Sequence, residues 1–60
     1  MKYRIEYKGR RPSYVNSRRE LLQLINHPQD AVADIRKVYK SGVTDSVMDK
    51  YRYLIGEVQP

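Results

Sequence analysis

The sequence has no cysteine, no phenylalanine and no tryptophan among its 60 residues. The lack of cysteine excludes a disulfide framework and any zinc site that uses thiolate ligands. Long apolar runs are missing as well, since the longest apolar cluster, residues 21–25, is interrupted by Gln23. A signal peptide or a membrane-spanning helix needs a longer run than this. We therefore expect an unprocessed, soluble, cytoplasmic protein.

Glycine is scarce, and the three glycines, Gly9, Gly42 and Gly56, stand far apart, so there is no glycine-rich phosphate loop. Repeats, low-complexity segments and linkers are also missing, which predicts one small domain over residues 1–60. A chain of this length buries only about 60% of the surface that its unfolded form exposes. With no covalent or metal staple, its stability must come from packing, capping or oligomerisation.

Positive charge is plentiful but unevenly distributed. Residues 1–19 carry seven basic side chains and one acidic side chain, a net charge of +6. Residues 20–60 carry five basic and six acidic side chains, a net charge of −1. Basic residues concentrated in one segment indicate a polyanionic partner more strongly than an evenly spread excess of positive charge would.

The N-terminal residues alternate between apolar and polar side chains, which predicts a strand with one buried face. The apolar positions are Met1, Tyr3, Ile5 and Tyr7, and the polar positions are Lys2, Arg4, Glu6 and Lys8. Gly9 then supplies a turn, and Pro12 begins a second strand that runs to Asn16. The two strands form a hairpin with a basic tip.

The next segment, Ser17-Arg18-Arg19-Glu20, reads as a capping box in which the Ser17 hydroxyl accepts from the Glu20 amide and the Glu20 carboxylate reaches back. Leucine and isoleucine follow at helical spacing up to residue 25, and Pro28 ends the helix near Asn26 or His27. We expect this helix to lie on the hairpin.

Residues 29–42 fit two structures. As a helix, they place Val32, Ile35, Val38 and Tyr39 on one face, with Gly42 as a left-handed cap. As a strand, their β-branched centre supplies the third partner that a two-stranded hairpin needs. We predict the strand and keep the helix as the alternative.

The C-terminal segment predicts a second helix. Thr44 is its expected N-cap, and Val43 and Met48 are expected to form a hydrophobic staple. The buried face of this helix comprises Val47, Tyr51, Leu54 and Ile55. Gly56 terminates it, and residues 57–60 are expected to fray. The fold class is α+β, with the order ββαβα, or ββααα if the middle segment is helical.

No pattern in the sequence predicts catalysis. A histidine at a helix end, as His27 is, more often caps the last carbonyl groups than serves as a base. Asp45 and Asp49 stand one turn apart, as do Asp30 and Asp34 in the helical alternative, but carboxylates at helix starts are explained by the helix dipole. We therefore expect a protein that is not an enzyme and has no catalytic, metal-binding or cofactor-binding residues.

The basic hairpin and the start of the first helix form the candidate binding site. Arg18 and Arg19 oppose the dipole of that helix, whose N-terminal amides attract anions, and basic side chains continue the stripe along the hairpin. The candidate nucleic-acid-binding residues are Lys2, Arg4, Lys8, Arg10, Arg11, Tyr14, Arg18 and Arg19.

All six aromatic residues are tyrosines, and we divide them by their expected position. Those expected in the core, with the hydroxyl at its rim, are Tyr3, Tyr7, Tyr39 and Tyr51. Tyr14 and Tyr53 are the two tyrosines that are expected outside the core. An exposed tyrosine can stack on an unpaired base or anchor a protein interface.

Two functions fit these observations. The first is a small accessory protein that binds DNA or RNA through phosphate contacts. The alternative is a protein-interaction module, such as an adaptor, modulator or inhibitor, that meets an acidic protein or a second copy of itself. In either case, the small size of the chain suits an accessory protein of a phage or mobile element. A membrane partner is not expected.

Overall fold

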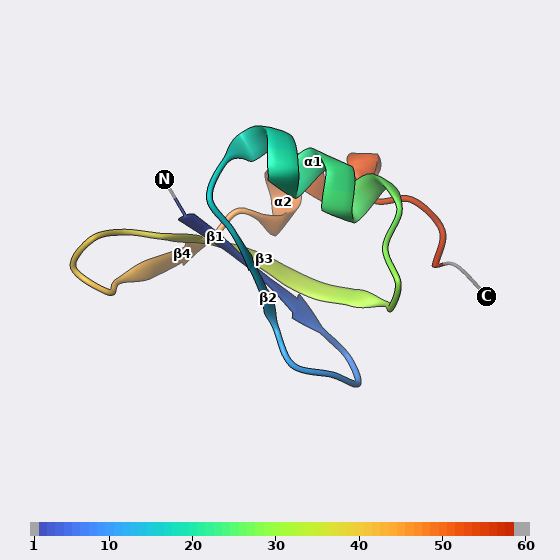
Figure 1. Cartoon of the computed structure of the whole chain (residues 1–60), viewed down its shortest axis with the longest axis horizontal. Coiled ribbons are helices and arrows are strands. Elements are labelled where there is room, and N and C mark those ends of the chain that lie inside the picture. Colours follow the sequence, from blue (N-terminus) through green and yellow to red (C-terminus); the bar gives the residue numbers. More distant parts are fainter. Residues whose placement is uncertain (1, 59–60) are drawn as a thin grey trace.

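The computed structural model describes residues 2–58, and Met1 and the last two residues of the chain lie outside this description. Its elements follow in the order ββαββα and end in a turn of 3-10 helix (Figure 1). They are β1 (Lys2–Tyr7), β2 (Ser13–Val15), α1 (Arg18–Asn26), β3 (Val32–Val38), β4 (Thr44–Ser46), α2 (Met48–Tyr51) and η1 (Arg52–Leu54).

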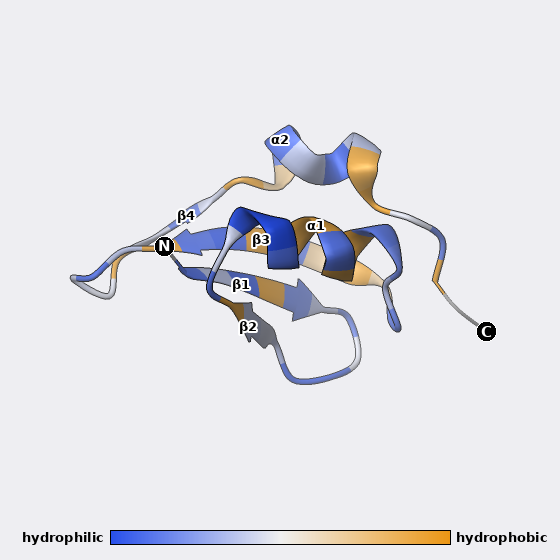
Figure 2. Ribbon diagram, turned by 45° about the horizontal axis from the view of Figure 1, so that its top comes forward, coloured by the Kyte–Doolittle hydropathy of each residue, from blue (hydrophilic) through white to orange (hydrophobic). Residues whose placement is uncertain are grey.

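The strands form a four-stranded antiparallel sheet in the order β2-β1-β3-β4. The helices α1 and α2 lie together on one side of this sheet (Figures 1 and 2). The protein is therefore a small α+β domain, as the patterning predicts. None of the helices in residues 2–58 is both long and apolar enough to cross a bilayer.

Alternation along β1 and β3 decides which face meets the helices. Ile5 and Ile35 are cross-strand partners, and both are completely buried. Leu21 and Ile25 of α1 are equally buried in the same cluster. The helical layer thus covers the side of the sheet that carries Ile5 and Ile35, and Arg4, Glu6, Asp34 and Arg36, which alternate with them, lie on the other side.

The first helix begins as its sequence predicts. Ser17 has extended backbone angles, and its hydroxyl accepts a hydrogen bond from the Glu20 amide at 3.2 Å. The helix ends at Asn26, and the fully buried Pro28 follows the C-cap residue His27. The strand interpretation of the middle segment is also confirmed, because β3 runs through it and pairs with β1.

The prediction for the C-terminal helix is wrong at its start. Thr44 is not an N-cap but the first residue of β4, and Val43 lies in the preceding turn with 59% of its surface exposed, so no staple forms with Met48. Gly42 has a φ of +92° in this turn, and the Tyr39 amide donates to the Val43 carbonyl across it. The edge of β3 takes a fourth strand here, and this pairing outweighs the helical pattern of the side chains.

The chain after η1 returns to the end of α1. The Gly56 amide donates to the Ile25 carbonyl at 2.8 Å, so an otherwise unpaired C-terminal carbonyl of the helix is satisfied by the tail. Gly56 was expected to terminate a helix, but its role is this close backbone contact. Residues 57–58 have no regular secondary structure, and the rest of the expected fraying segment lies outside the described residues.

Candidate nucleic-acid interface

The eight predicted site residues fall into three groups in space. Lys2, Arg4 and Tyr14 lie on the side of the sheet away from the helices, which we call the outer face. Lys8, Arg10 and Arg11 belong to the loop of residues 8–12 that joins β1 to β2, which we call the hairpin tip. Arg18 and Arg19 open α1. The tip and the start of α1 are separated by the length of β2, so the predicted stripe is not one continuous patch (Figure 1).

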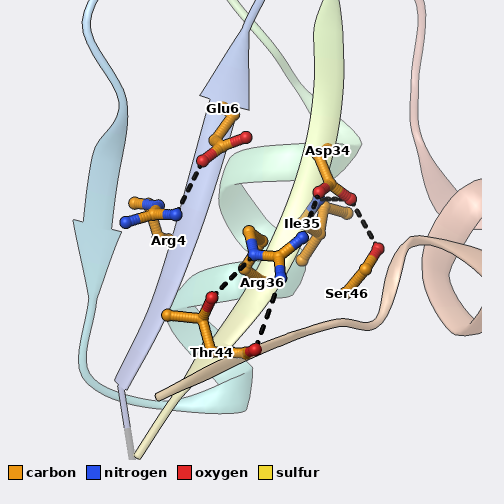
Figure 3. A network of polar contacts seen from close by, with 7 residues as sticks. All are labelled: Arg4, Glu6, Asp34, Ile35, Arg36, Thr44 and Ser46. Carbon is orange, nitrogen blue, oxygen red and sulfur yellow. Dashed lines mark hydrogen bonds and ion pairs between the residues drawn. The ribbon is translucent and has the colours of Figure 1, made fainter. Parts of the chain in front are cut away.

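The outer face carries a network of charges (Figure 3). Arg4 stands directly opposite Arg36 in the pairing of β1 with β3, and Glu6 stands opposite Asp34. Like charges opposed in this way repel. This repulsion is offset by ion pairs within each strand. Arg4 pairs with Glu6 at 2.8 Å along β1, and Arg36 pairs with Asp34 at 2.9 Å along β3.

Arg36 also joins β3 to β4. Its Nε donates to Thr44 Oγ1 at 2.9 Å, and its Nη2 donates to the Thr44 carbonyl at 3.3 Å. On the same face the Ser46 hydroxyl donates to Asp34 Oδ1 at 2.7 Å. The short fourth strand is therefore held by side chains as well as by its ladder, which explains why a three-residue strand forms here.

Asp34 is the acceptor at the centre of this network, and its pKa lies below the usual range. Burial raises this pKa, but hydrogen bonds from the Ser46 hydroxyl, the Arg36 guanidinium and the Ile35 amide favour the ionised form more strongly. The pKa is thus lower in the folded chain than in the unfolded chain. The stabilisation is present above about pH 4, the unfolded value, and is lost as the pH falls through the lowered folded value.

We expect Asp34→Asn to lower the free energy of unfolding by about 1–2 kcal/mol at pH 7, because a charge-assisted acceptor is replaced by a neutral amide. Urea denaturation of both proteins between pH 7 and pH 2 tests this. The difference should shrink as the wild-type carboxylate becomes protonated. Asp49→Asn is the control, since the Asp49 side chain is 95% exposed. Equal effects of the two substitutions, or a pH-independent difference, would contradict the role of Asp34.

Arg4 is held within the outer face and is less available to a partner than the pattern predicts. A hydrogen bond with the Tyr14 hydroxyl raises the pKa of Arg4, and Glu6 acts in the same direction. Its Nε is buried and has no hydrogen-bond partner among residues 2–58. Tyr14 itself is 57% exposed, as expected from the sequence.

Arg18 has a partner within the chain. Its Nε donates to the Tyr51 hydroxyl at 3.3 Å, and its guanidinium carbon lies 5.9 Å from the centre of the Tyr51 ring. Tyr51 in turn makes an edge-to-face contact with Tyr3 at 6.4 Å between ring centres. The unfavourable position of Arg18 against the helix dipole is thus offset by a contact that joins α1 to α2. Arg19 is exposed and has no such partner among the described residues.

The hairpin tip projects from the sheet (Figure 1). Its basic side chains are exposed. The Arg10 guanidinium carbon lies 5.2 Å from the centre of the Tyr7 ring, while Arg11 and Lys8 make no side-chain hydrogen bond or ion pair within residues 2–58. One carboxylate is nearby, because Asp30 lies beside Gly9.

The tyrosine predictions are confirmed with one exception. Tyr3 and Tyr51 are buried, Tyr7 packs against the core, and Tyr53 is 80% exposed. Tyr39, expected in the core, is 40% exposed because it lies just beyond the end of β3.

Sequence reasoning missed a second basic location. The start of β1 and the ends of β2 and β3 enclose a groove, which we call the lysine groove, lined by Lys2, Asn16, Val38, Tyr39 and Lys40. Pairing the predicted first strand antiparallel with the predicted third would have placed Lys2 near Lys40. That pairing was not predicted, so the lysines of the second half were read only as a balance to the acidic residues.

The sequence analysis places the acidic residues at helix starts, and this prediction is only partly right. Asp49 lies in the first turn of α2, but Asp45 is in β4, opposite Lys37, and Asp30 accepts from the Ala31 amide. His27 is exposed at the C-cap of α1. Among residues 2–58, no three histidine, cysteine or acidic side chains gather as a metal site would require. The arrangement therefore offers a cationic and aromatic surface.

Neither a known family model, nor a curated protein, nor a solved structure matches this chain.

Proposed function

We propose that this protein is a non-enzymatic accessory protein that binds nucleic acid through phosphate contacts from its hairpin tip and the start of α1. One observation carries the proposal. Of the seven basic residues in the first 19, only Arg4 has a carboxylate within 4.0 Å among residues 2–58. The acidic residues, in contrast, are largely engaged by groups of the chain itself, as Asp34 and Asp49 are by arginines.

Unpaired surface cations are what phosphate binding needs. A basic side chain that already has a carboxylate partner must break that ion pair to reach a phosphate, whereas Lys8, Arg11 and Arg19 have no ion pair to break. Their exposure also leaves them hydrated and mobile enough to follow a polyanionic backbone. Release of counterions from that backbone then drives association.

Binding to a labelled DNA duplex, followed by fluorescence anisotropy between about 50 and 200 mM salt, tests this proposal. If about four to six phosphates are neutralised, log K falls with log salt with a slope of about −4 to −5. Arg10→Ala with Arg11→Ala should make the slope less negative by about 2, since each phosphate contact contributes about 1.

The matched control is Lys50→Ala with Arg52→Ala, which removes the same charge from the helical layer. We expect it to leave the slope within about 0.5 of the wild-type value, since neither residue belongs to the proposed site. Equal loss in both double variants would show that net charge, not the hairpin tip, is what matters. No binding of either a duplex or a single strand at low salt would end the nucleic-acid proposal and turn the search to a protein partner, for which the 80% exposed Tyr53 is the first residue to replace.

A further inference from the structure

The lysine groove combines two ammonium groups with an aromatic ring. Lys2 opens β1 and Lys40 follows β3, and the antiparallel pairing of these strands brings the two lysines to one end of the sheet. Neither has a carboxylate within 4.0 Å among the described residues. Asn16, which follows β2, adds an exposed amide to the same groove.

Tyr39 is held in place by its neighbours. The Lys37 ammonium lies 5.2 Å from the centre of its ring, a distance at which a cation is attracted to the π face. A hydrogen bond to the Asp45 carboxylate raises the pKa of the Tyr39 hydroxyl, and Asp45 stands opposite Lys37 in the pairing of β3 with β4. Tyr39 as a residue remains 40% exposed and lines the groove, so it offers an aromatic surface to a ligand.

We propose that the lysine groove binds one unpaired nucleotide of a single strand, with its base stacked on the Tyr39 ring and its flanking phosphates against Lys2 and Lys40. This rests on the proposed function and specifies its substrate class. Single-strand sites elsewhere combine aromatic platforms with cationic grooves, because every base has a face to stack and every nucleotide has a phosphate. The Asn16 amide can donate to or accept from the base or sugar.

The groove distinguishes single strands from duplexes. Inside a duplex both faces of a base are covered by its neighbours, so the Tyr39 ring gains a base to stack on only when the nucleotide is unpaired. The lysines alone would serve either form equally. Tyr39 must therefore contribute to the affinity for single strands and not to the affinity for duplexes.

The test uses the full chain and two labelled probes, an oligothymidylate of about 12 nucleotides and a duplex of the same length. We expect Tyr39→Leu to weaken binding of the single strand about tenfold, the size of a lost base–aromatic stack, and binding of the duplex less than about twofold. Tyr39→Phe keeps the ring and should stay within about twofold on both probes. Tyr53→Leu, at a tyrosine that is 80% exposed on η1, is the matched control and should change neither affinity.

A second pair of variants tests the lysines without touching the ring. Lys2→Gln with Lys40→Gln should make the single-strand salt slope less negative by about 1–2, while Lys50→Gln with Arg52→Gln should leave it unchanged. This pair keeps the proposal testable if Tyr39→Leu does not fold, since the lysines are exposed and unpaired.

Each outcome separates the groove from the proposed function. If Tyr39→Leu affects both probes equally or neither, or if Tyr39→Phe loses as much as Tyr39→Leu, base stacking in the groove is refuted. A salt slope that still depends on Arg10 and Arg11 would then leave the proposed function standing. If the wild-type chain binds neither probe at low salt, both proposals are refuted together.

Discussion

Replacing Gly56 with alanine is expected to lower the free energy of unfolding by about 2–4 kcal/mol, a large part of what a domain of this size has. A Cβ at this position would overlap the carbonyl oxygen of Asn26 and lie 2.9 Å from its carbonyl carbon. Both atoms belong to helix backbone, which cannot turn aside as a side chain can. The tail must therefore move away from α1, and the hydrogen bond from the Gly56 amide to the Ile25 carbonyl is lost.

Gly9→Ala is the matched control for this substitution. The nearest atom to an added Cβ at Gly9 is Asp30 Oδ2 at 4.0 Å, which is an ordinary contact. Urea denaturation followed by circular dichroism compares the two variants with the wild type. We expect Gly9→Ala to change the midpoint little. If Gly56→Ala is equally harmless, the packing of the tail on α1 is not what stabilises the end of the helix.

The second large effect is expected at Ile35, in the middle of the sheet. Its side chain is completely buried and faces Ile5 across the pairing of β1 with β3. We expect Ile35→Ala to cost about 2–5 kcal/mol, because the transfer energy of the lost carbons is joined by the cost of a cavity. Because the core of a domain of this size rarely supplies more than about 3–5 kcal/mol, much of the population should unfold at room temperature.

Thermal unfolding of Ile35→Ala and Ile35→Val, with Val43→Ala as control, measures this. Val43 lies in the turn before β4 and is 59% exposed, so removing its methyl groups should leave the midpoint within a few degrees of the wild type. Ile35→Val should fall between the two, since it removes a single buried carbon. A small effect of Ile35→Ala would mean that the sheet does not depend on this cross-strand pair.

Local patterns in the sequence were enough for the first half of the fold. Alternation predicts β1, Gly9 and Pro12 mark the hairpin, and Ser17 with Glu20 marks the start of α1. Each of these signals acts between residues that are near one another in the chain, so their physical cause is already present in a short segment. The choice of a strand for residues 32–38 required one tertiary argument, the need of the hairpin for a partner.

The C-terminal half was misread where local and tertiary preferences compete. Thr44 suits an N-cap and also a strand, and nothing near it in the sequence decides between them. Arg36 decides it, because its guanidinium binds both the Thr44 hydroxyl and the Thr44 carbonyl. The four-residue α2 begins only after the fourth strand has been added to the sheet.

The sequence by itself determined the α+β class, the first helix and the basic character of the N-terminal third, because periodicity, capping and charge are properties of neighbouring residues. Only the tertiary structure decided which cations are engaged. It joined Arg18 to Tyr51, and it brought Lys2 and Lys40 to one groove. The physical reason is that these contacts join distant segments: the antiparallel pairing of β1 with β3 alone brings together residues between 25 (Tyr7 and Val32) and 36 (Lys2 and Val38) positions apart, a separation over which the sequence carries no local signal.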